Sequence, residues 1–298
     1  MARRKWSWTP LQNKRSKNVL EVANDLRRFW PLTLRQIYYQ LVSKGYIENK
    51  RSEYIMLSKL VKWMRIDEML PWNSLEDRSR TVTRKRGFED INEFVESEID
   101  NFLEGYTRCL VQGQDKYIEV WTEKDALLRI FEEVVWPYCI RAVVCRGYSS
   151  VTFISDFYNR AENAIMKGQS PLVLYFGDLD PSGVQMLEAT IETLENELDL
   201  YGVVFKRIAL NPEQIEFYHL PYDPTAAKMS DPRYKRYVEE YGTLAVELDS
   251  LHPRDLQEMI RSAIESEIDM DLFRKQQEIE EVDIQHVRSI REKVMNVI

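Results

Sequence analysis

A short apolar run that ends in an acidic turn constrains the fold of this chain more than any other feature. Residues 172–176 read LVLYF, and a glycine ends the run at once, which is typical of a buried strand. Asp178 and Asp180 follow, and the chain then turns into an amphipathic segment at residues 184–198. Ligands of open α/β sheets gather at the carboxyl ends of the strands, so this turn is a candidate site.

The pattern on both sides of this run predicts an α/β fold with a mostly parallel, Rossmann-like sheet. Strand and helix patterns alternate, which favours right-handed crossovers with helices on both faces of the sheet. The expected strands are 117–122, 142–145, 172–176 and 203–210, and the expected helices between them are 125–135, 151–167 and 184–198. These elements make up an expected domain at residues 114–212.

Carboxylates follow two of the expected strands. Glu123 stands at the end of the first strand, and Asp178 and Asp180 stand at the end of the third. Like charges this close are unfavourable unless a cation holds them, and Mg²⁺ prefers carboxylate and water oxygens. The three residues are therefore the predicted ligands of Mg²⁺, with Mn²⁺ as an alternative ion. Turn and helix-capping chemistry is the other interpretation of the Asp-x-Asp pair. Glu247 and Asp249 are additional candidates, which the sequence alone does not place.

The two signs of charge are segregated along the 298 residues, although the net charge is only −8. Residues 1–86 carry 20 Lys/Arg and 8 Asp/Glu, whereas residues 87–298 carry 21 and 41. A basic front of this size indicates a surface for a polyanion such as nucleic acid, and a solvated basic surface is the alternative. The residues expected to contact DNA phosphates are Lys59, Lys62, Arg65, Arg78, Arg80, Arg84, Lys85 and Arg86.

Three helical patterns in the basic front, the first starting near residue 17, predict a winged-helix or helix-turn-helix module. In the second helix Tyr38 falls on the apolar face, whereas Arg35 and Tyr39 lie four residues apart on a neighbouring face. We therefore expect Tyr38 in the core and Tyr39 exposed beside a positive charge. The module and an amphipathic connector helix at residues 88–103 form the expected first domain, residues 1–110.

Residues 213–298 form the expected third region, an extended wrap punctuated by prolines and followed by two helices. The final helix carries an apolar stripe that packs either on its own domain or on a second copy of the chain. No stretch approaches the roughly 18 apolar residues that span a bilayer, and the N-terminus lacks the apolar segment of a signal peptide. A cytoplasmic protein that does not associate with membranes is expected.

Two motifs together resemble a known family. The turn GDLDPSG, preceded by the strand that ends in Glu123, and the Arg35-x-x-x-Tyr39 helix in TLRQIYYQL resemble the DNA-cleaving subunit of topoisomerase VI and its meiotic double-strand-break relatives. In that family a winged-helix domain with the catalytic tyrosine precedes a Toprim metal-binding domain, and the resemblance covers residues 30–210. It implies that Tyr39 is the nucleophile, that Arg35 stabilises the phosphate and that the three carboxylates bind the metal.

The activity that this resemblance implies is cleavage of double-stranded DNA by a homodimer through a 5′-phosphotyrosyl link. A separate ATPase protein is expected as a partner, because the chain carries no P-loop or other ATP motif. Two alternatives remain open. A Toprim nuclease that hydrolyses DNA with a metal-activated water would not need Tyr39. A DNA-binding component of a defence or partition complex would bind DNA without cleaving it.

Overall fold

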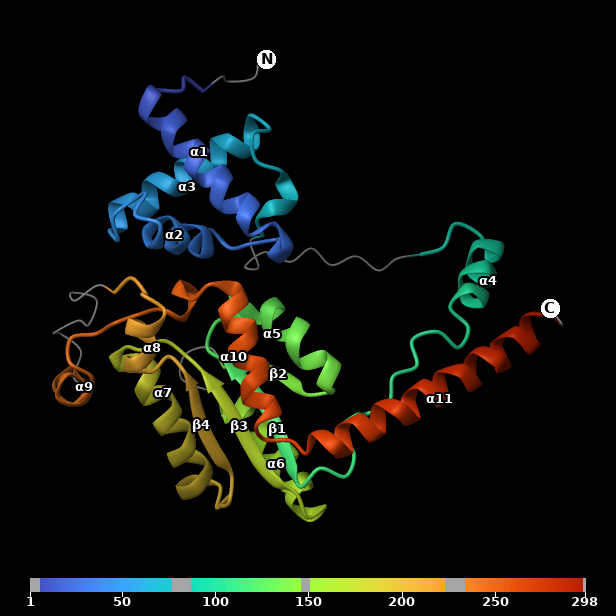
Figure 1. Cartoon of the computed structure of the whole chain (residues 1–298). Coiled ribbons are helices and arrows are strands. Elements are labelled where there is room, and N and C mark those ends of the chain that lie inside the picture. The colour runs from blue at the N-terminus through green and yellow to red at the C-terminus, as the bar shows by residue number, and fades with distance from the viewer. Residues whose placement is uncertain (1–5, 77–86, 146–150, 223–233, 297–298) are drawn as a thin grey trace.

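The computed structural model describes residues 6–76, 87–145, 151–222 and 234–296. A helical N-terminal body lies over one edge of an α/β body, and the C-terminal helix projects away from both (Figure 1). Within the described residues, no helix is both long enough and apolar enough to cross a membrane.

Three helices build the N-terminal body around one apolar core. They are α1 (Pro10–Asp25), α2 (Leu34–Ser43) and α3 (Arg51–Ile66). The prediction that the first helix starts near residue 17 is wrong: Thr9 and Gln12 form a capping box, and Pro10 occupies the first helical position, where its missing N–H costs nothing. A second capping box, between Thr33 and Gln36, starts α2.

The winged-helix prediction for this body is not confirmed. Apart from helical turns, its described part contains one isolated bridge, between Leu32 and Leu75. Five of the residues expected to bind DNA lie outside the described residues: Arg78, Arg80, Arg84, Lys85 and Arg86.

The second body contains a four-stranded sheet in which all pairings are parallel. Its strands are β1 (Lys116–Thr122), β2 (Arg141–Val144), β3 (Ser170–Phe176) and β4 (Val204–Ala209), in the order β2-β1-β3-β4. Each strand agrees with its predicted bounds to within two residues, so the predicted α/β fold with a parallel sheet is confirmed. Thr122 pairs with Phe176, and the ends of β1 and β3 therefore lie side by side.

Helices cover both faces of this sheet. One face packs on α5 (Leu128–Val135) and α10 (Pro253–Glu265), and the other packs on α6 (Val151–Met166) and the π-helical turn Thr193–Glu197, which continues α7 (Pro181–Glu192). The helix expected to begin at residue 125 starts instead as a 3-10 turn, Asp125–Leu127, before α5.

The C-terminal region is more helical than predicted. The proline-punctuated wrap contains α8 (Pro212–Phe217) and α9 (Tyr234–Tyr241), and a 3-10 turn, Leu248–Ser250, precedes α10 and α11 (Met270–Met295). Leu179 and Val246 form an antiparallel bridge, which holds the segment before α10 against the acidic turn after β3.

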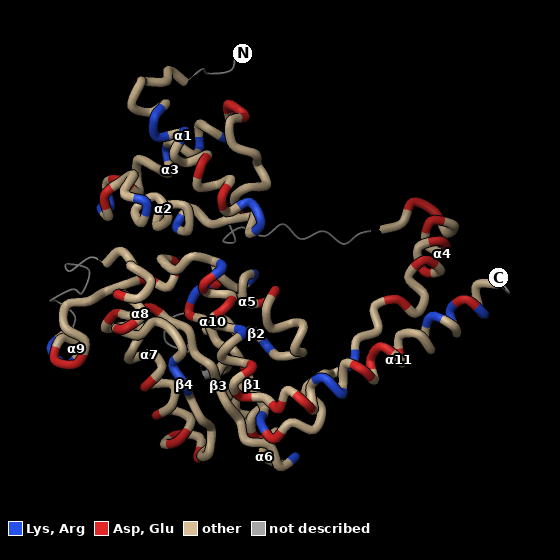
Figure 2. The backbone as a smooth tube through the Cα atoms, viewed as in Figure 1, with Lys and Arg blue, Asp and Glu red and all other residues tan. Residues whose placement is uncertain are grey.

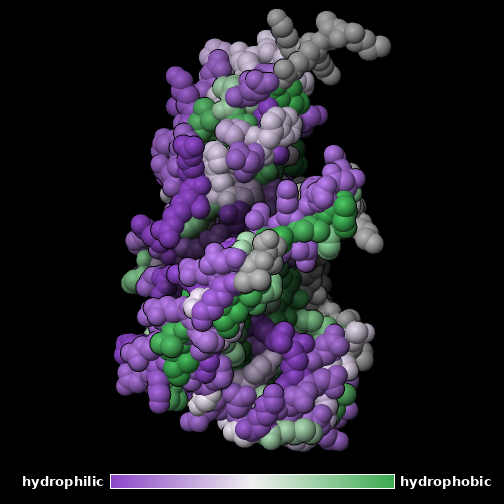
Figure 3. Space-filling model, turned by 90° about the vertical axis from the view of Figure 1, so that its right-hand side faces the viewer, coloured by the Kyte–Doolittle hydropathy of each residue, from purple (hydrophilic) through white to green (hydrophobic). Residues whose placement is uncertain are grey.

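An arm projects from the α/β body. It consists of the outer part of α11 and of α4 (Ile91–Asp100), which has no buried residue and whose charged residues are all acidic (Figure 2). Arg291 of α11 binds the carbonyl oxygen of Asp100 and pairs with Glu104. Apolar side chains are exposed on the side from which the arm projects (Figure 3). The structure therefore leaves both predictions for the apolar stripe of the last helix open.

Candidate functional site

The carboxyl ends of β1 and β3 bring two of the predicted metal ligands together. The backbone N–H of Glu123 donates to the carbonyl of Phe176, which continues the β1–β3 ladder by one residue. The backbone N–H of Asp178 in turn donates to Oε2 of Glu123 at 3.1 Å. The sheet register, and not a flexible loop, therefore sets the position of these two carboxylates.

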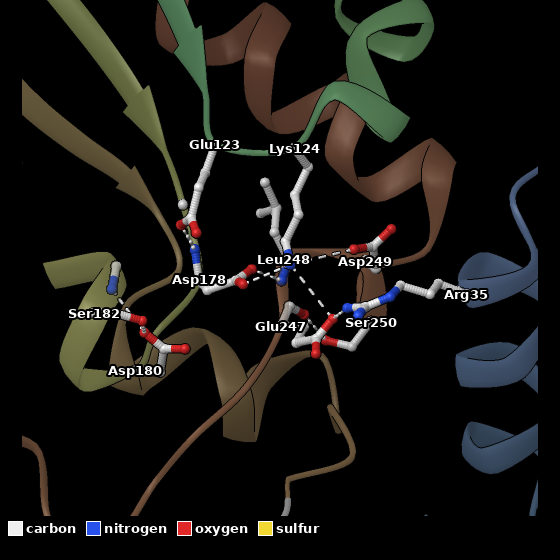
Figure 4. A network of polar contacts seen from close by, with 12 residues as sticks. Arg35, Glu123, Lys124, Asp178, Asp180, Ser182, Glu247, Leu248, Asp249 and Ser250 are labelled. Carbon is white, nitrogen blue, oxygen red and sulfur yellow. Dashed lines mark hydrogen bonds and ion pairs between the residues drawn. The ribbon is translucent and has the colours of Figure 1, made fainter. Parts of the chain in front are cut away.

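Gly183 allows α7 to begin against this pair. A Cβ at Gly183 would lie 2.6 Å from the carbonyl oxygen of Asp178 and 3.1 Å from Oε2 of Glu123. Only a residue without a side chain fits this approach. Asp180 is the N-cap of α7 and accepts hydrogen bonds from the Gly183 N–H and the Ser182 hydroxyl, so its carboxylate turns towards the helix (Figure 4).

The segment between α9 and α10 adds two carboxylates to the site. The N–H of Leu248 donates to Oδ1 of Asp178 at 2.8 Å, which places Glu247 and Asp249 beside the acidic turn (Figure 4). The sequence raised both residues as candidates, and the missing signal was the non-local bridge that folds this segment back. We name the five carboxylates the acid cluster: Glu123, Asp178, Asp180, Glu247 and Asp249.

Lys124 lies inside the acid cluster. Its Nζ is 2.6 Å from Oδ2 of Asp178, 3.4 Å from Oε2 of Glu247 and 3.7 Å from Oδ2 of Asp249. Burial lowers the pKa of Lys124, but Asp178 and Asp249 outweigh this effect, and the pKa of the ammonium is raised above its usual value. Lys124 is therefore a fixed cation at the centre of the site.

Asp249 is the most deeply buried carboxylate of the cluster. It is 1% exposed, and neither of its oxygens accepts a hydrogen bond from the described residues. Burial raises the pKa of Asp249, while the charge of Lys124 opposes the rise. A buried carboxylate without hydrogen bonds is costly unless a cation compensates its charge.

The donor chemistry of the acid cluster fits a hard divalent cation such as Mg²⁺. Burial and the charge of Asp178 raise the pKa of Glu123, so the repulsion in the cluster is relieved by a proton and would equally be relieved by a metal ion. Within the part of the chain that the structure describes, however, no three His, Cys, Asp or Glu side chains stand ready to hold a metal. The reason is visible in Figure 4: Asp180 caps α7, and Lys124 contacts Asp178.

The helix α2 brings the predicted catalytic residues to the acid cluster. It packs against the turn Leu248–Ser250, and the exposed guanidinium of Arg35 pairs with Glu247. Tyr39 was predicted to be exposed, but it is half-buried because α2 docks on this turn. Burial raises the pKa of Tyr39, and the charges of Asp249 and Asp178 add to the rise, while Arg35 lowers it. The phenol therefore lies within electrostatic reach of the cluster.

The two neighbouring tyrosines differ as the helical wheel predicted. Tyr38 is 4% exposed, and its hydroxyl donates to Oδ1 of Asn49 at 3.0 Å, so it belongs to the core of the N-terminal body. Its ring packs edge-on against the rings of Tyr39 and Tyr54. These contacts hold the Tyr39 ring at the boundary between the core and the acid cluster.

A groove of about 800 Å³ runs between α3 and the 3-10 turn Asp125–Leu127. Its charged lining residues are the cations Arg35, Lys62 and Arg65 and the carboxylates Glu76 and Asp125. Trp72, which is 61% exposed, also lines it, and the Arg65 guanidinium lies 4.5 Å from the centre of the Trp72 ring. Lys59, also predicted to bind DNA, instead lines a different cavity between α1 and α3. Of the three residues of α3 that were predicted to bind DNA, the structure thus groups two, Lys62 and Arg65, with Arg35.

Comparison with known proteins adds no assignment to this geometry. No protein-family model matches the chain, and neither the curated proteins nor the solved structures contain a match.

Proposed function

We propose that this chain is a DNA-cleaving transesterase, related to the DNA-cleaving subunit of topoisomerase VI, in which Tyr39 attacks a phosphodiester of double-stranded DNA. The observation that carries the proposal is the docking of α2 on the acid cluster. Arg35 pairs with Glu247, and the charges of Asp249 and Asp178 raise the pKa of the Tyr39 phenol. A tyrosine, an arginine and a set of carboxylates, remote from one another in sequence, thus meet at the end of a parallel sheet.

The proposed reaction replaces one ester bond by another. The Tyr39 oxygen bonds to phosphorus, the bond from phosphorus to the DNA 3′-oxygen breaks, and that oxygen takes up a proton. The 5′-phosphate stays on Tyr39 as a phosphotyrosyl ester. The strand can be rejoined without an energy source, because the ester bond is conserved.

The resting phenol has to lose its proton during the attack. Burial keeps the pKa of Tyr39 above its usual value, so the neutral form predominates at neutral pH. Asp249 and Asp178 are the carboxylates whose charges raise the pKa of the phenol, so the proposed proton acceptor is a carboxylate of the acid cluster. Arg35 stabilises the developing phenolate and the phosphate by its charge.

Glu123, Asp178 and Asp180 would hold the Mg²⁺ ion. The ion would stabilise negative charge on the phosphate and orient it. α2 docks on the turn Leu248–Ser250, and the N–H of Leu248 in this turn binds Asp178, which supports a shared site for the metal and the phosphate.

The groove beside α3, in which three cations outnumber two carboxylates, supports double-stranded DNA as the substrate. Lys62 and Arg65 offer cations for backbone phosphates, and the groove leads to Arg35. Cutting both strands requires two sites, so we propose a homodimer. We also propose a separate ATPase protein as the partner that supplies any ATP dependence. The winged-helix architecture of the N-terminal body, with the basic residues at 78–86, remains part of this proposal.

A covalent-trapping assay tests the proposal. The purified chain is incubated with supercoiled plasmid and Mg²⁺ or Mn²⁺, and the reaction is stopped with detergent. We expect nicked or linear DNA with protein attached to its 5′ ends. Tyr39→Phe and Asp178→Asn should abolish the attachment. Tyr38→Phe is the matched control, because it removes a neighbouring phenol hydroxyl that points into the core, and it should retain the attachment.

Each other outcome selects a different function. Cleavage that survives Tyr39→Phe but is lost in Asp178→Asn, with no protein on the DNA, would replace the transesterase by a hydrolytic nuclease. Tight binding without cleavage, in the presence of either metal, would favour a DNA-binding component of a defence or partition complex.

A further inference from the structure

Lys124 lies among three carboxylates whose oxygens are the type of ligand that divalent ions use. Three carboxylates surround its ammonium group, at 2.6 Å for Asp178, 3.4 Å for Glu247 and 3.7 Å for Asp249 (Figure 4). They come from two segments far apart in sequence, and carboxylate oxygens gathered in this way are the ligands that Mg²⁺ and Ca²⁺ prefer. The ammonium group thus lies where a cation is surrounded by carboxylate oxygens from both segments.

The acid cluster therefore has two parts that share Asp178. The first part contains Glu123, Asp178 and Asp180, whose oxygens receive hydrogen bonds from backbone N–H groups and from the hydroxyl of Ser182. The second part contains Asp178 and the two carboxylates around Lys124. Each carboxylate oxygen has two lone pairs, so Asp178 can contact Lys124 and still accept a metal ion in the first part.

Asp249 independently marks the second part as a cation position. Its carboxylate is 1% exposed and receives no hydrogen bond from the described residues. The distance of 3.7 Å between Oδ2 of Asp249 and Nζ of Lys124 is short enough for an ion pair but too long for a hydrogen bond. A carboxylate buried in this way is stabilised almost entirely by a neighbouring cation. Its free lone pairs are what a metal ion would use in place of the ammonium group.

We infer that Lys124 fills the second cation position of the acid cluster, so that the chain binds one divalent ion and not two, and that removing its charge admits a second ion. The inference rests on the proposed magnesium site and specifies its stoichiometry. Two-metal sites place ions about 3.5–4 Å apart to stabilise the attacking and leaving oxygens together. In this chain a covalently attached cation would take the place of one of them.

A count of bound Mn²⁺ tests the inference without DNA. The full chain is titrated with Mn²⁺, and free Mn²⁺ is measured by its electron paramagnetic resonance signal. We expect one bound ion in the unaltered chain, with an uncoupled spectrum. In Lys124→Met, which keeps the apolar stem and removes the charge, we expect two ions with a spin-coupled spectrum. Lys206→Met is the matched control, because Lys206 pairs with Glu267 away from the cluster, and it should bind one ion.

The remaining outcomes overturn the inference. They are two ions in the unaltered chain, one ion in Lys124→Met, or no ion in the unaltered chain. Because Lys124→Met leaves Asp178 and Asp249 without their cation, thermal melts with and without Mn²⁺ accompany the count. A variant that folds only with Mn²⁺ and then holds two ions supports the inference, and one that Mn²⁺ does not restore contradicts it.

A double variant gives a further check. Lys124→Met combined with Asp249→Asn removes one of the two uncompensated charges, and the ion of the first part would compensate the other, on Asp178. This double variant should fold and bind a single ion, and a count of two would contradict the assignment of Asp249. Since DNA is absent throughout, failure of these counts is distinguishable from failure of the trapping assay.

Discussion

Replacing Gly183 with alanine tests how closely α7 packs on the acid cluster. Two effects of known sign oppose each other. Alanine stabilises a helix relative to glycine by about 1 kcal/mol. The added Cβ, however, would lie 2.6 Å from the backbone oxygen of Asp178, which cannot rotate away, and 3.1 Å from Oε2 of Glu123. Overpacking typically costs about 1–3 kcal/mol, and a backbone obstacle places this contact in the upper part of that range.

We therefore expect Gly183→Ala to lower the free energy of unfolding by about 1–2 kcal/mol, which corresponds to a fall in Tm of about 2–8 °C. Thermal unfolding followed by circular dichroism measures the change. Gly87→Ala is the control, because a Cβ at Gly87 meets nothing within 4 Å, and its Tm should stay the same or rise slightly. A rise in the Tm of Gly183→Ala would refute the reasoning. It would mean that the gain in helix propensity is larger than the cost of the contact between the added Cβ and the Asp178 carbonyl oxygen.

Three further predictions concern other parts of the molecule. Glu119 is 0% exposed and pairs with Arg160, so Glu119→Gln should lower the free energy of unfolding by about 2–4 kcal/mol in urea melts, and an unchanged midpoint would contradict a structural role. Measured by fluorescence anisotropy, Trp72→Ala should lower the affinity for DNA, because it removes the ring that holds the Arg65 guanidinium at the groove, and Glu247→Gln should raise it, because it removes a negative charge beside Arg35. Burial raises the pKa of Glu267, but its partners Lys116 and Lys206 outweigh burial and lower the pKa below its usual value. The carboxylate therefore stabilises the fold above the usual glutamate pKa, and this contribution is lost as the pH falls. Glu267→Gln should flatten the acid side of a plot of the free energy of unfolding against pH.

The sheet and the acidic turn were predictable because their signals are local. The run that forms β3 consists of apolar residues, one of them β-branched and two aromatic, and it ends at a glycine. The other strands are also short runs rich in apolar residues. Parallel pairing followed from the alternation with helices, and the register then placed Glu123 beside Asp178. The helical wheel separated Tyr38 from Tyr39 for the same reason, since α2 is a regular helix with one buried face.

The second half of the site was not predictable from local signals. Asp249 and Glu247 reach the cluster because Val246 bridges Leu179, a contact between residues 67 positions apart that no periodicity encodes. The contact of Arg207 with the acidic turn was missed for the same reason. Arg207 lies on β4, and its guanidinium donates hydrogen bonds to the backbone carbonyls of Gly177 and Asp178, which holds the turn in place. The helix-capping interpretation of the Asp-x-Asp pair, by contrast, was available from the sequence and holds for Asp180, which is the N-cap of α7.

The contact between Arg35 and Glu247 bears on how DNA reaches the acid cluster. Under the proposed function the Arg35 guanidinium has to face a phosphate, and in this structure it faces Glu247. The two side chains are 46% and 34% exposed, and exposed pairs of this kind contribute only about 0.2–1 kcal/mol. A phosphate can therefore replace Glu247 at small cost. Glu247 keeps Lys124 as a partner at 3.4 Å, so the exchange leaves no uncompensated charge in the site. The docking of α2 is for this reason compatible with entry of DNA.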